Sequence, residues 1–143
     1  MANSGGSPTP GYSPPPTRGN PTGSGAEGTV FDLPGHPDWV LKEFKPGTAA
    51  TQASNDANHL DGLRRVFGDR HVVQTVAPPR HFAPGQPVVL LKQKVIIVIG
   101  GEDQAALKLI VDTLTRQNIT ADVGKNLVWG HTGDGIARWI WIE

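Results

Sequence analysis

Apolar positions in the first half of the chain follow two different periods, which predict strands first and a helix after them. Residues 29–33 and 39–44 are short β-prone runs separated by a turn that contains Pro and Gly. Residues 48–67 instead place apolar side chains three or four positions apart, which is the spacing of one helix face. We therefore expect two strands and then a helix, with Thr48 as the N-cap and Gly68 just beyond the end.

The second half of the chain shows the same mixture of strand and helix patterns. Residues 72–77 and 87–99 are rich in β-branched residues and predict strands, the second one interrupted by polar residues. Residues 102–118 predict a second helix, with acidic residues at its start and Arg116 near its end. Residues 127–143 predict two strands around a glycine-containing turn. Strands with segregated helices predict an α+β fold.

The first 25 residues have a different composition from the rest of the chain. They hold six glycines, six prolines and one charged residue, Arg18. Such a segment buries too little apolar surface to offset the entropy lost on ordering, so we expect it to be disordered. The chain is therefore divided into a leader of residues 1–22 and one domain of residues 23–143, which is long enough for one modest core.

Charge and cysteine content exclude several classes of function. The chain has 13 basic and 13 acidic residues, so its net charge gives no electrostatic reason to bind nucleic acid or a membrane surface. The absence of cysteine excludes disulfides, thiolate metal sites and a cysteine nucleophile. The longest apolar run, residues 95–99, is too short to span a bilayer. The N-terminus lacks the basic and apolar regions of a Sec signal peptide.

A glycine-rich motif precedes the first predicted strand. Residues 23–30 follow the pattern G-x-G-x-x-G-x-V, and Lys42 lies on the next predicted strand. Glycines let backbone N–H groups approach phosphate oxygens, and an ammonium anchored on a strand can neutralise them. A dinucleotide-binding fingerprint would open a helix, whereas a strand follows here, so we expect the loop to join two strands. The alternative is that the glycines are simply the end of a linker.

The loop and the lysine together resemble the phosphate-covering loop and third-strand lysine of the protein-kinase fold. This resemblance implies that Lys42 binds ATP phosphates. It also implies a lysine partner on the following helix, where Asp56 lies on the apolar stripe. An aspartate on a solvated flank is the alternative for Asp56. The nucleotide-binding residues implied by the resemblance are Gly23, Ser24, Gly25, Ala26, Glu27, Gly28, Val30 and Lys42.

Residues 122–126 and the predicted C-terminal strands resemble the kinase catalytic loop and its following hairpin. The resemblance implies a catalytic role for Asp122, which orients the acceptor hydroxyl, beside Lys42 and Asp56. It also implies that Asn126 and Glu143 bind magnesium, which prefers such oxygen ligands. The loop is one residue shorter than in kinases and no D-F-G follows. A plain β-hairpin preceded by an aspartate turn therefore stays open as an alternative.

The combined pattern resembles the minimal kinase-like effectors and toxins that bacteria secrete, some of which phosphorylate a host chaperone. The implied fold is a minimal protein-kinase-like fold, with a β-rich N-lobe that has one helix and a strongly reduced C-lobe. Adenine would lie beside residues 91–95. The implied activity is transfer of the γ-phosphate of ATP, with Mg²⁺, to a Ser or Thr hydroxyl of a target protein.

The resemblance also implies where the protein acts. A secreted effector acts in the cytoplasm of a host or target cell, and the chain is otherwise expected to be cytoplasmic. Its partner is then a protein substrate such as a host chaperone, with no nucleic acid and no membrane span. Two alternatives stay open: a nucleotide-binding pseudokinase, which the loose catalytic loop favours, and a noncatalytic interaction module. Trp139 and Trp141 alternate on one predicted strand, so we expect core packing rather than ligand stacking.

Overall fold

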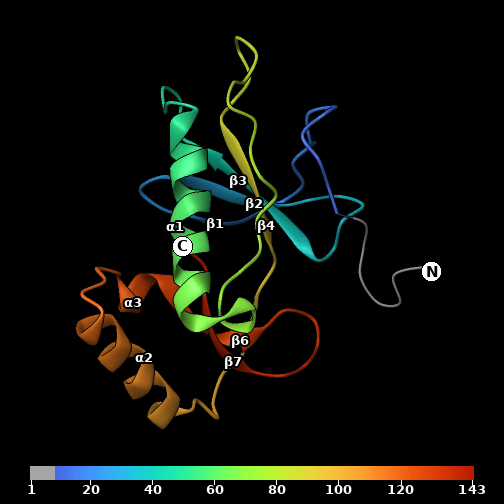
Figure 1. Cartoon of the computed structure of the whole chain (residues 1–143). Helices are drawn as coiled ribbons and strands as arrows, with labels where there is room; N and C mark the ends of the chain where they lie inside the picture. Colours follow the sequence, from blue (N-terminus) through green and yellow to red (C-terminus); the bar gives the residue numbers. More distant parts are fainter. Residues whose placement is uncertain (1–8) are drawn as a thin grey trace, which may run out of the picture. The chain divides into compact units, whose positions relative to one another are not determined.

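The chain forms an α+β structure, as the sequence predicts. A computed structural model describes residues 9–143, and this part of the chain contains seven strands in two antiparallel sheets and three α-helices (Figure 1). It divides into two compact units. The first unit comprises the described residues up to Asn58 together with Gln74–Lys94, and the second comprises His59–Val73 and Val95–Glu143. No helix in the described part of the chain is both long and apolar enough to cross a bilayer.

The first unit is built on a four-stranded antiparallel sheet with the order β1-β2-β3-β4. Its strands are β1 (Pro21–Ser24), β2 (Gly28–Asp32), β3 (Trp39–Phe44) and β4 (Val89–Gln93). Alternation along β3 sends Leu41 to one face of the sheet and Lys42 to the other. In the register, Leu41 pairs with Leu91 and Lys42 pairs with Leu90.

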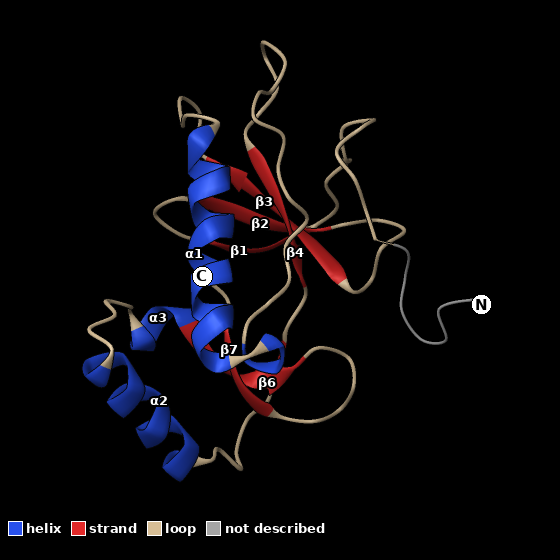
Figure 2. Ribbon diagram, in the orientation of Figure 1, coloured by secondary structure: helices blue, strands red, loops and turns tan. Residues whose placement is uncertain are grey.

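Each face of this sheet has its own small core. One face buries apolar side chains of β3 and β4 under Tyr12, Val76 and Phe82. The other face packs Phe44 and Leu90 against Ala53 and Ala57 of helix α1 (Thr51–Phe67). Small alanines let the helix lie close to the strands, and Figure 2 shows α1 in blue beside the red strands of this sheet. The face that carries Lys42 is therefore the face covered by α1.

The second unit contains a three-stranded antiparallel sheet, the C-terminal half of α1 and two further helices. The strands β5 (Ile96–Ile97), β6 (Leu127–His131) and β7 (Arg138–Trp141) pair in the order β5-β6-β7. The helices are α2 (Gln104–Arg116) and the single turn α3 (Val123–Asn126), and a 3₁₀ turn covers Asp69–His71. Residues 127–143 thus form the two strands around a turn that the sequence predicts.

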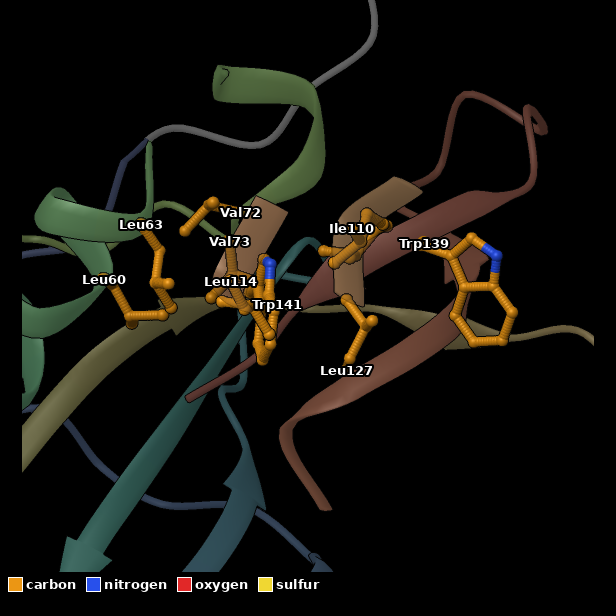
Figure 3. Close-up of a cluster of buried hydrophobic side chains, with 10 residues drawn as sticks. Leu60, Leu63, Val72, Val73, Ile110, Leu114, Leu127, Trp139 and Trp141 are labelled. Atoms are coloured by element: carbon orange, nitrogen blue, oxygen red, sulfur yellow. The ribbon is translucent and has the colours of Figure 1, made fainter. Parts of the chain in front are cut away.

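The core of the second unit joins helix and strand residues around Trp141, which is completely buried (Figure 3). Trp139 lies on the same strand face, and its indole N–H donates to the carbonyl of Asp103 over 2.8 Å. The expectation that these tryptophans pack in the core is confirmed. The other buried members of the cluster are Leu60, Leu63, Val72, Val73, Ile110, Leu114, Leu127 and Ile140.

Both helices are shorter than the sequence patterns predict. Helix α1 begins at Thr51 rather than Thr48, because residues 45–50 form turns in which the N–H of Thr48 donates to the Lys45 carbonyl. Gly68 follows the helix with a φ of 90°, which favours glycine and ends the helix as expected. Helix α2 begins at Gln104 because the side chain of Asp103 caps it by accepting from the Ala106 N–H.

The expected disorder of the first 25 residues is wrong for the part of this segment that the structure describes. Strand β1 lies within it and pairs with β2, so the predicted boundary between residues 22 and 23 cuts a strand. The hydroxyl of Tyr12 donates to the Val76 carbonyl over 2.7 Å and accepts from the Leu91 N–H over 2.9 Å. The Tyr12 ring also packs against the buried cluster on one face of the first sheet, so this part of the predicted leader contributes to the first unit. Residues 1–8 of the predicted leader lie outside the described residues.

The strand predicted at residues 72–77 does not form. Val72 makes an isolated bridge with Trp141, and Thr75 makes another with Lys92. The segment passes from the second unit to the first between Val73 and Gln74, so its two ends pair in different units. The predicted long β segment of residues 87–99 is likewise divided into β4 and β5, because the chain leaves the first unit after Lys94.

Candidate functional site

The glycine-rich loop joins β1 to β2 in a hairpin, as the sequence predicts. The N–H of Gly25 donates to the Gly28 carbonyl over 2.9 Å, and the N–H of Lys45 donates to the Glu27 carbonyl over 3.0 Å. Both ends of the loop are thus held through the backbone. The loop positions its residues next to the end of β3, because Gly28 pairs with Phe44 in the sheet register.

The three glycines of the motif differ in whether packing requires a glycine at that position. A Cβ on Gly28 would lie 2.1 Å from the carbonyl oxygen of Glu43, so the close approach of β3 requires a glycine at this position. A Cβ on Gly23 or Gly25 would meet no described atom within 4 Å. Packing in the described part of the chain therefore explains why position 28 is a glycine. It does not explain Gly23 or Gly25, where the space that a Cβ would occupy is open.

Lys42 is almost completely buried, although it carries an ammonium group. Its side chain is 4% exposed and lies on the α1 face of the sheet. The Nζ atom lies 3.2 Å from the Oδ2 of Asp56 and 4.8 Å from the centre of the Phe44 ring. A buried charge requires such partners, because an unpaired charge in the interior has a large desolvation cost. The ion pair that the apolar stripe of the helix suggested is present.

The carboxylate of Asp56 is positioned by the helix that carries it. Gln52 lies one turn earlier on α1, and its amide donates to Oδ1 of Asp56 over 2.9 Å. The other oxygen, Oδ2, accepts from Lys42. The two oxygens are thus used by two different donors, and the carboxylate plane is fixed relative to β3. This second contact, through Gln52, was not predicted, although a glutamine four residues before an aspartate is a recognisable helix pair.

For Glu27, the sequence pattern predicted the position of the backbone but not the contact of the side chain. The motif placed its backbone in the phosphate loop, but its side chain lies on the lysine, with Oε1 2.8 Å from Nζ of Lys42. Its side chain is 56% exposed, whereas that of Asp56 is 22% exposed. Lys42 therefore has one exposed partner from the loop and one largely buried partner from the helix. Spacing along the chain could not reveal this contact, since residues 27 and 42 meet only through the strand register.

The second unit carries the other predicted site residues. Asp122 is the N-cap of α3, and its Oδ1 accepts from the Lys125 N–H over 3.1 Å. A carboxylate has several acceptor positions, so this contact leaves Asp122 further acceptor capacity. The local structure of the segment follows from this cap, which starts a single helical turn directly before β6.

Asn126 and Glu143 are brought to the same end of the β6–β7 hairpin. The carbonyl of Asn126 accepts from the N–H of Ile142 over 2.8 Å, and Glu143 is the next residue. The N–H of Asn126 in turn donates to the Asp122 carbonyl over 2.9 Å. Backbone contacts thus gather Asp122, Asn126 and Glu143 in one part of the second unit, although they are up to 21 positions apart in the numbering.

A shallow depression of about 370 Å³ lies beside this segment in the second unit. It is formed by the C-terminal part of α2 and the connection to α3, and it includes both neighbours of Asp122 in the sequence. Its lining residues are Val111, Leu114, Thr115, Asn118, Ile119, Thr120, Ala121 and Val123.

The sequence matches no protein-family model and has no significant match among curated proteins. Assignment of a function therefore depends on the residues themselves. Three features of the structure bear on this assignment: the strand–loop–strand motif, the paired lysine on β3, and the polar residues gathered at the start of β6.

Proposed function

We propose that this protein is an ATP-dependent protein kinase of the bacterial effector or toxin type. It would transfer the γ-phosphate of ATP to a hydroxyl group of a target protein. The observation that carries the proposal is the ion pair between Lys42 on β3 and Asp56 on α1, next to a glycine-rich hairpin. In the kinase fold a strand lysine and a helical carboxylate form the same kind of pair, which orients the ammonium toward the nucleotide phosphates.

The first unit would bind the nucleotide. Backbone N–H groups of residues 24–28 would face the phosphates, and Lys42 would neutralise part of their charge. Asp56, held by Gln52, would keep the ammonium in place during transfer. Phosphoryl transfer needs mainly positioning and charge stabilisation, so a fixed ammonium in a buried environment is well suited to it.

The second unit would supply the acceptor and metal functions. Asp122 would orient the acceptor hydroxyl through its carboxylate. Asn126 and Glu143 offer an amide oxygen and a carboxylate, which are donors that Mg²⁺ accepts, and the Asn126 carbonyl accepts from the N–H of Ile142, the residue before Glu143. Bound Mg²⁺ would neutralise negative charge on the phosphates. A host chaperone is the type of substrate that the effector resemblance suggests, and the cytoplasm of a host or target cell is the corresponding place of action.

A second candidate function has a specific observation in its favour. Two carboxylates already lie on the ammonium of Lys42 within the first unit, so the buried charge is compensated without a nucleotide. That arrangement is also what a structural ion pair would show. A noncatalytic interaction module would use these residues only as such a structural ion pair. A pseudokinase would bind nucleotide through the same residues without transferring phosphate.

Phosphate transfer with matched variants separates these functions. Wild type, Lys42→Met and Asp122→Asn are incubated with radiolabelled ATP, Mg²⁺ and a eukaryotic cell lysate, and nucleotide binding is followed separately by thermal shift. Labelled proteins that disappear with both variants are the expected result. No label, but a thermal shift that needs Lys42, would identify a pseudokinase. If neither labelling nor a thermal shift is observed, both the kinase and the pseudokinase are excluded, and the noncatalytic interaction module is the function that stays.

A further inference from the structure

Glu27 and Asp56, the carboxylates of the first unit that lie on Lys42, differ in where they come from and in how firmly they are held. Asp56 is largely buried on a helix, and both of its oxygens have donors, from Lys42 and from Gln52. Glu27 comes from the tip of the β1–β2 hairpin and is more than half exposed. The shorter of the two contacts, 2.8 Å, is nevertheless made by Glu27. The exposed partner is therefore in full contact with the buried ammonium.

The contact of Glu27 can be released without unfolding the loop. Its backbone carbonyl accepts from the Lys45 N–H, and the neighbouring turn is closed by Gly25 and Gly28. These backbone bonds do not involve the carboxylate. Among the described residues, a rotation of the Glu27 side chain into solvent would break its contact with Lys42 alone, whereas release of Asp56 would also break its bond with Gln52.

We propose that Glu27 is a displaceable counter-ion that occupies the phosphate-binding position of Lys42 and competes with polyphosphate anions for it. This inference rests on the proposed function, because it assumes that the ligand of Lys42 is a nucleotide phosphate chain. Glu27 and the phosphates are both anions, so they repel each other at one ammonium. Asp56 stays on the lysine in both states and keeps it oriented. Glu27 thereby lowers the affinity of the site and closes the loop over Lys42 when no anion is bound.

The inference predicts that removal of one negative charge strengthens anion binding. Glu27→Gln keeps the size of the side chain and removes its charge, and we expect about tenfold tighter binding, allowing for the partial exposure of the group. Raising the ionic strength from about 0.05 M to about 0.5 M should reduce this difference, since salt screens exposed charges. Asp32→Asn is the matched control, because Asp32 is also a partly exposed carboxylate in an ion pair of the first unit, with Lys94.

The experiment measures binding of sodium tripolyphosphate and, separately, of ATP with Mg²⁺ by calorimetry to the full chain. Tighter tripolyphosphate binding by Glu27→Gln, unchanged binding by Asp32→Asn, and loss of binding in the Glu27→Gln, Lys42→Met double variant would support the inference. Equal or weaker binding by Glu27→Gln, or no binding by any variant, would overturn it. The proposed function is judged by the ATP arm and by transfer, so a kinase with unchanged Glu27→Gln affinity would reject only the inference. Tight tripolyphosphate binding without any ATP binding would reject only the kinase.

Discussion

Lys42 and Asp56 form an ion pair of 3.2 Å across two elements, a strand and a helix, in which the lysine side chain is almost fully buried. Both residues belong to the first unit, and the pair lies on the sheet face that α1 covers. A second lysine of the same unit, Lys94, pairs with Asp32, and its side chain is 39% exposed, about ten times the exposed fraction of Lys42. Burial therefore distinguishes the Lys42 pair from an ordinary surface ion pair, and it gives the pair measurable consequences.

Loss of the helical partner should destabilise the fold even if no nucleotide is ever bound. Asp56→Asn removes the charge opposite Lys42 and leaves Glu27 as its other carboxylate in the first unit. We expect the free energy of unfolding to fall by about 1–3 kcal/mol, measured by urea denaturation. A double-mutant cycle with Lys42→Met isolates the pair, and a coupling of at least about 0.5 kcal/mol is expected. Strictly additive changes would show that the pair contributes no interaction energy.

The third glycine of the motif, Gly28, should contribute much more to the stability of the fold than the second, Gly25. Gly28→Ala would place a methyl group 2.1 Å from the Glu43 carbonyl oxygen, and the strand would have to shift. We expect a loss of stability on the order of 2–3 kcal/mol, measured by thermal or urea unfolding. Gly25→Ala is the matched control, since its methyl group would meet no atom of residues 9–143 within 4 Å, and a change within about 0.5 kcal/mol is expected. Similar losses for both variants would contradict this explanation of Gly28.

Tyr12 should stabilise the first unit through its hydroxyl. Tyr12→Phe leaves the Val76 carbonyl and the Leu91 N–H without this partner, so we expect a loss of about 2 kcal/mol at pH 8. Burial raises the pKa of Tyr12 to about 12, from 10.0, despite the hydrogen bond from Leu91, which lowers it.

The raised pKa gives this stabilisation a defined pH dependence. A group whose folded pKa is raised stabilises the fold fully below its unfolded pKa and loses that contribution as pH rises through the folded value. The advantage of wild type over Tyr12→Phe should therefore be constant up to about pH 10 and decline toward pH 12. Urea denaturation of both proteins across this range measures the difference, in which the titration of lysines cancels. A difference that stays constant up to pH 12 would argue against a buried, hydrogen-bonded hydroxyl.

Two substitutions at Asp122 should separate its structural role from its catalytic one. Asparagine caps helices as well as aspartate does, so Asp122→Asn should keep the stability within about 0.5 kcal/mol while removing the carboxylate. Asp122→Ala should cost about 1 kcal/mol, because the Lys125 N–H loses its acceptor. Both variants should lose phosphate transfer if the proposed function is right.

Asp103 provides the control for this pair, because it caps α2 in the same way by accepting from the Ala106 N–H. Asp103→Ala should lower stability by a similar amount and leave phosphate transfer unchanged. Full activity in Asp122→Asn would remove Asp122 from the reaction and leave it as a helix cap.

Local patterns predicted the two longer helices and most of the strands. The helical spacing of apolar residues located α1 and also placed Asp56 on its inner face, from which the pair with Lys42 could be expected. The glycine motif predicted a strand–loop–strand unit, and the structure has the β1–β2 hairpin there. These predictions succeed because periodicity and turn residues act within a few positions of the chain.

Other features depended on partners that are far apart in the sequence. Tyr12 orders part of a segment whose composition indicates disorder, through contacts with Val76 and Leu91, 64 and 79 positions away. The β pattern of residues 72–77 failed because its two ends belong to different units. Composition and periodicity describe residues that are close together in the sequence. Neither can predict a hydrogen bond to a distant residue, or the point at which the chain passes from one compact unit to the other.

The amino-acid sequence was enough to predict the α+β class, the approximate positions of α1 and α2 and a loop between strands at the glycine motif, and it offered Asp56 as one candidate partner of Lys42. Three contacts appear only in the folded chain: Glu27 lies on the ammonium of Lys42, the Glu43 carbonyl leaves room only for glycine at position 28, and Asn126 is hydrogen-bonded to Ile142. The two groups of features differ because helix faces and turns are set by local backbone geometry, whereas these contacts are set by strand register. Register depends on how whole strands pack against each other, and a single sequence does not record it.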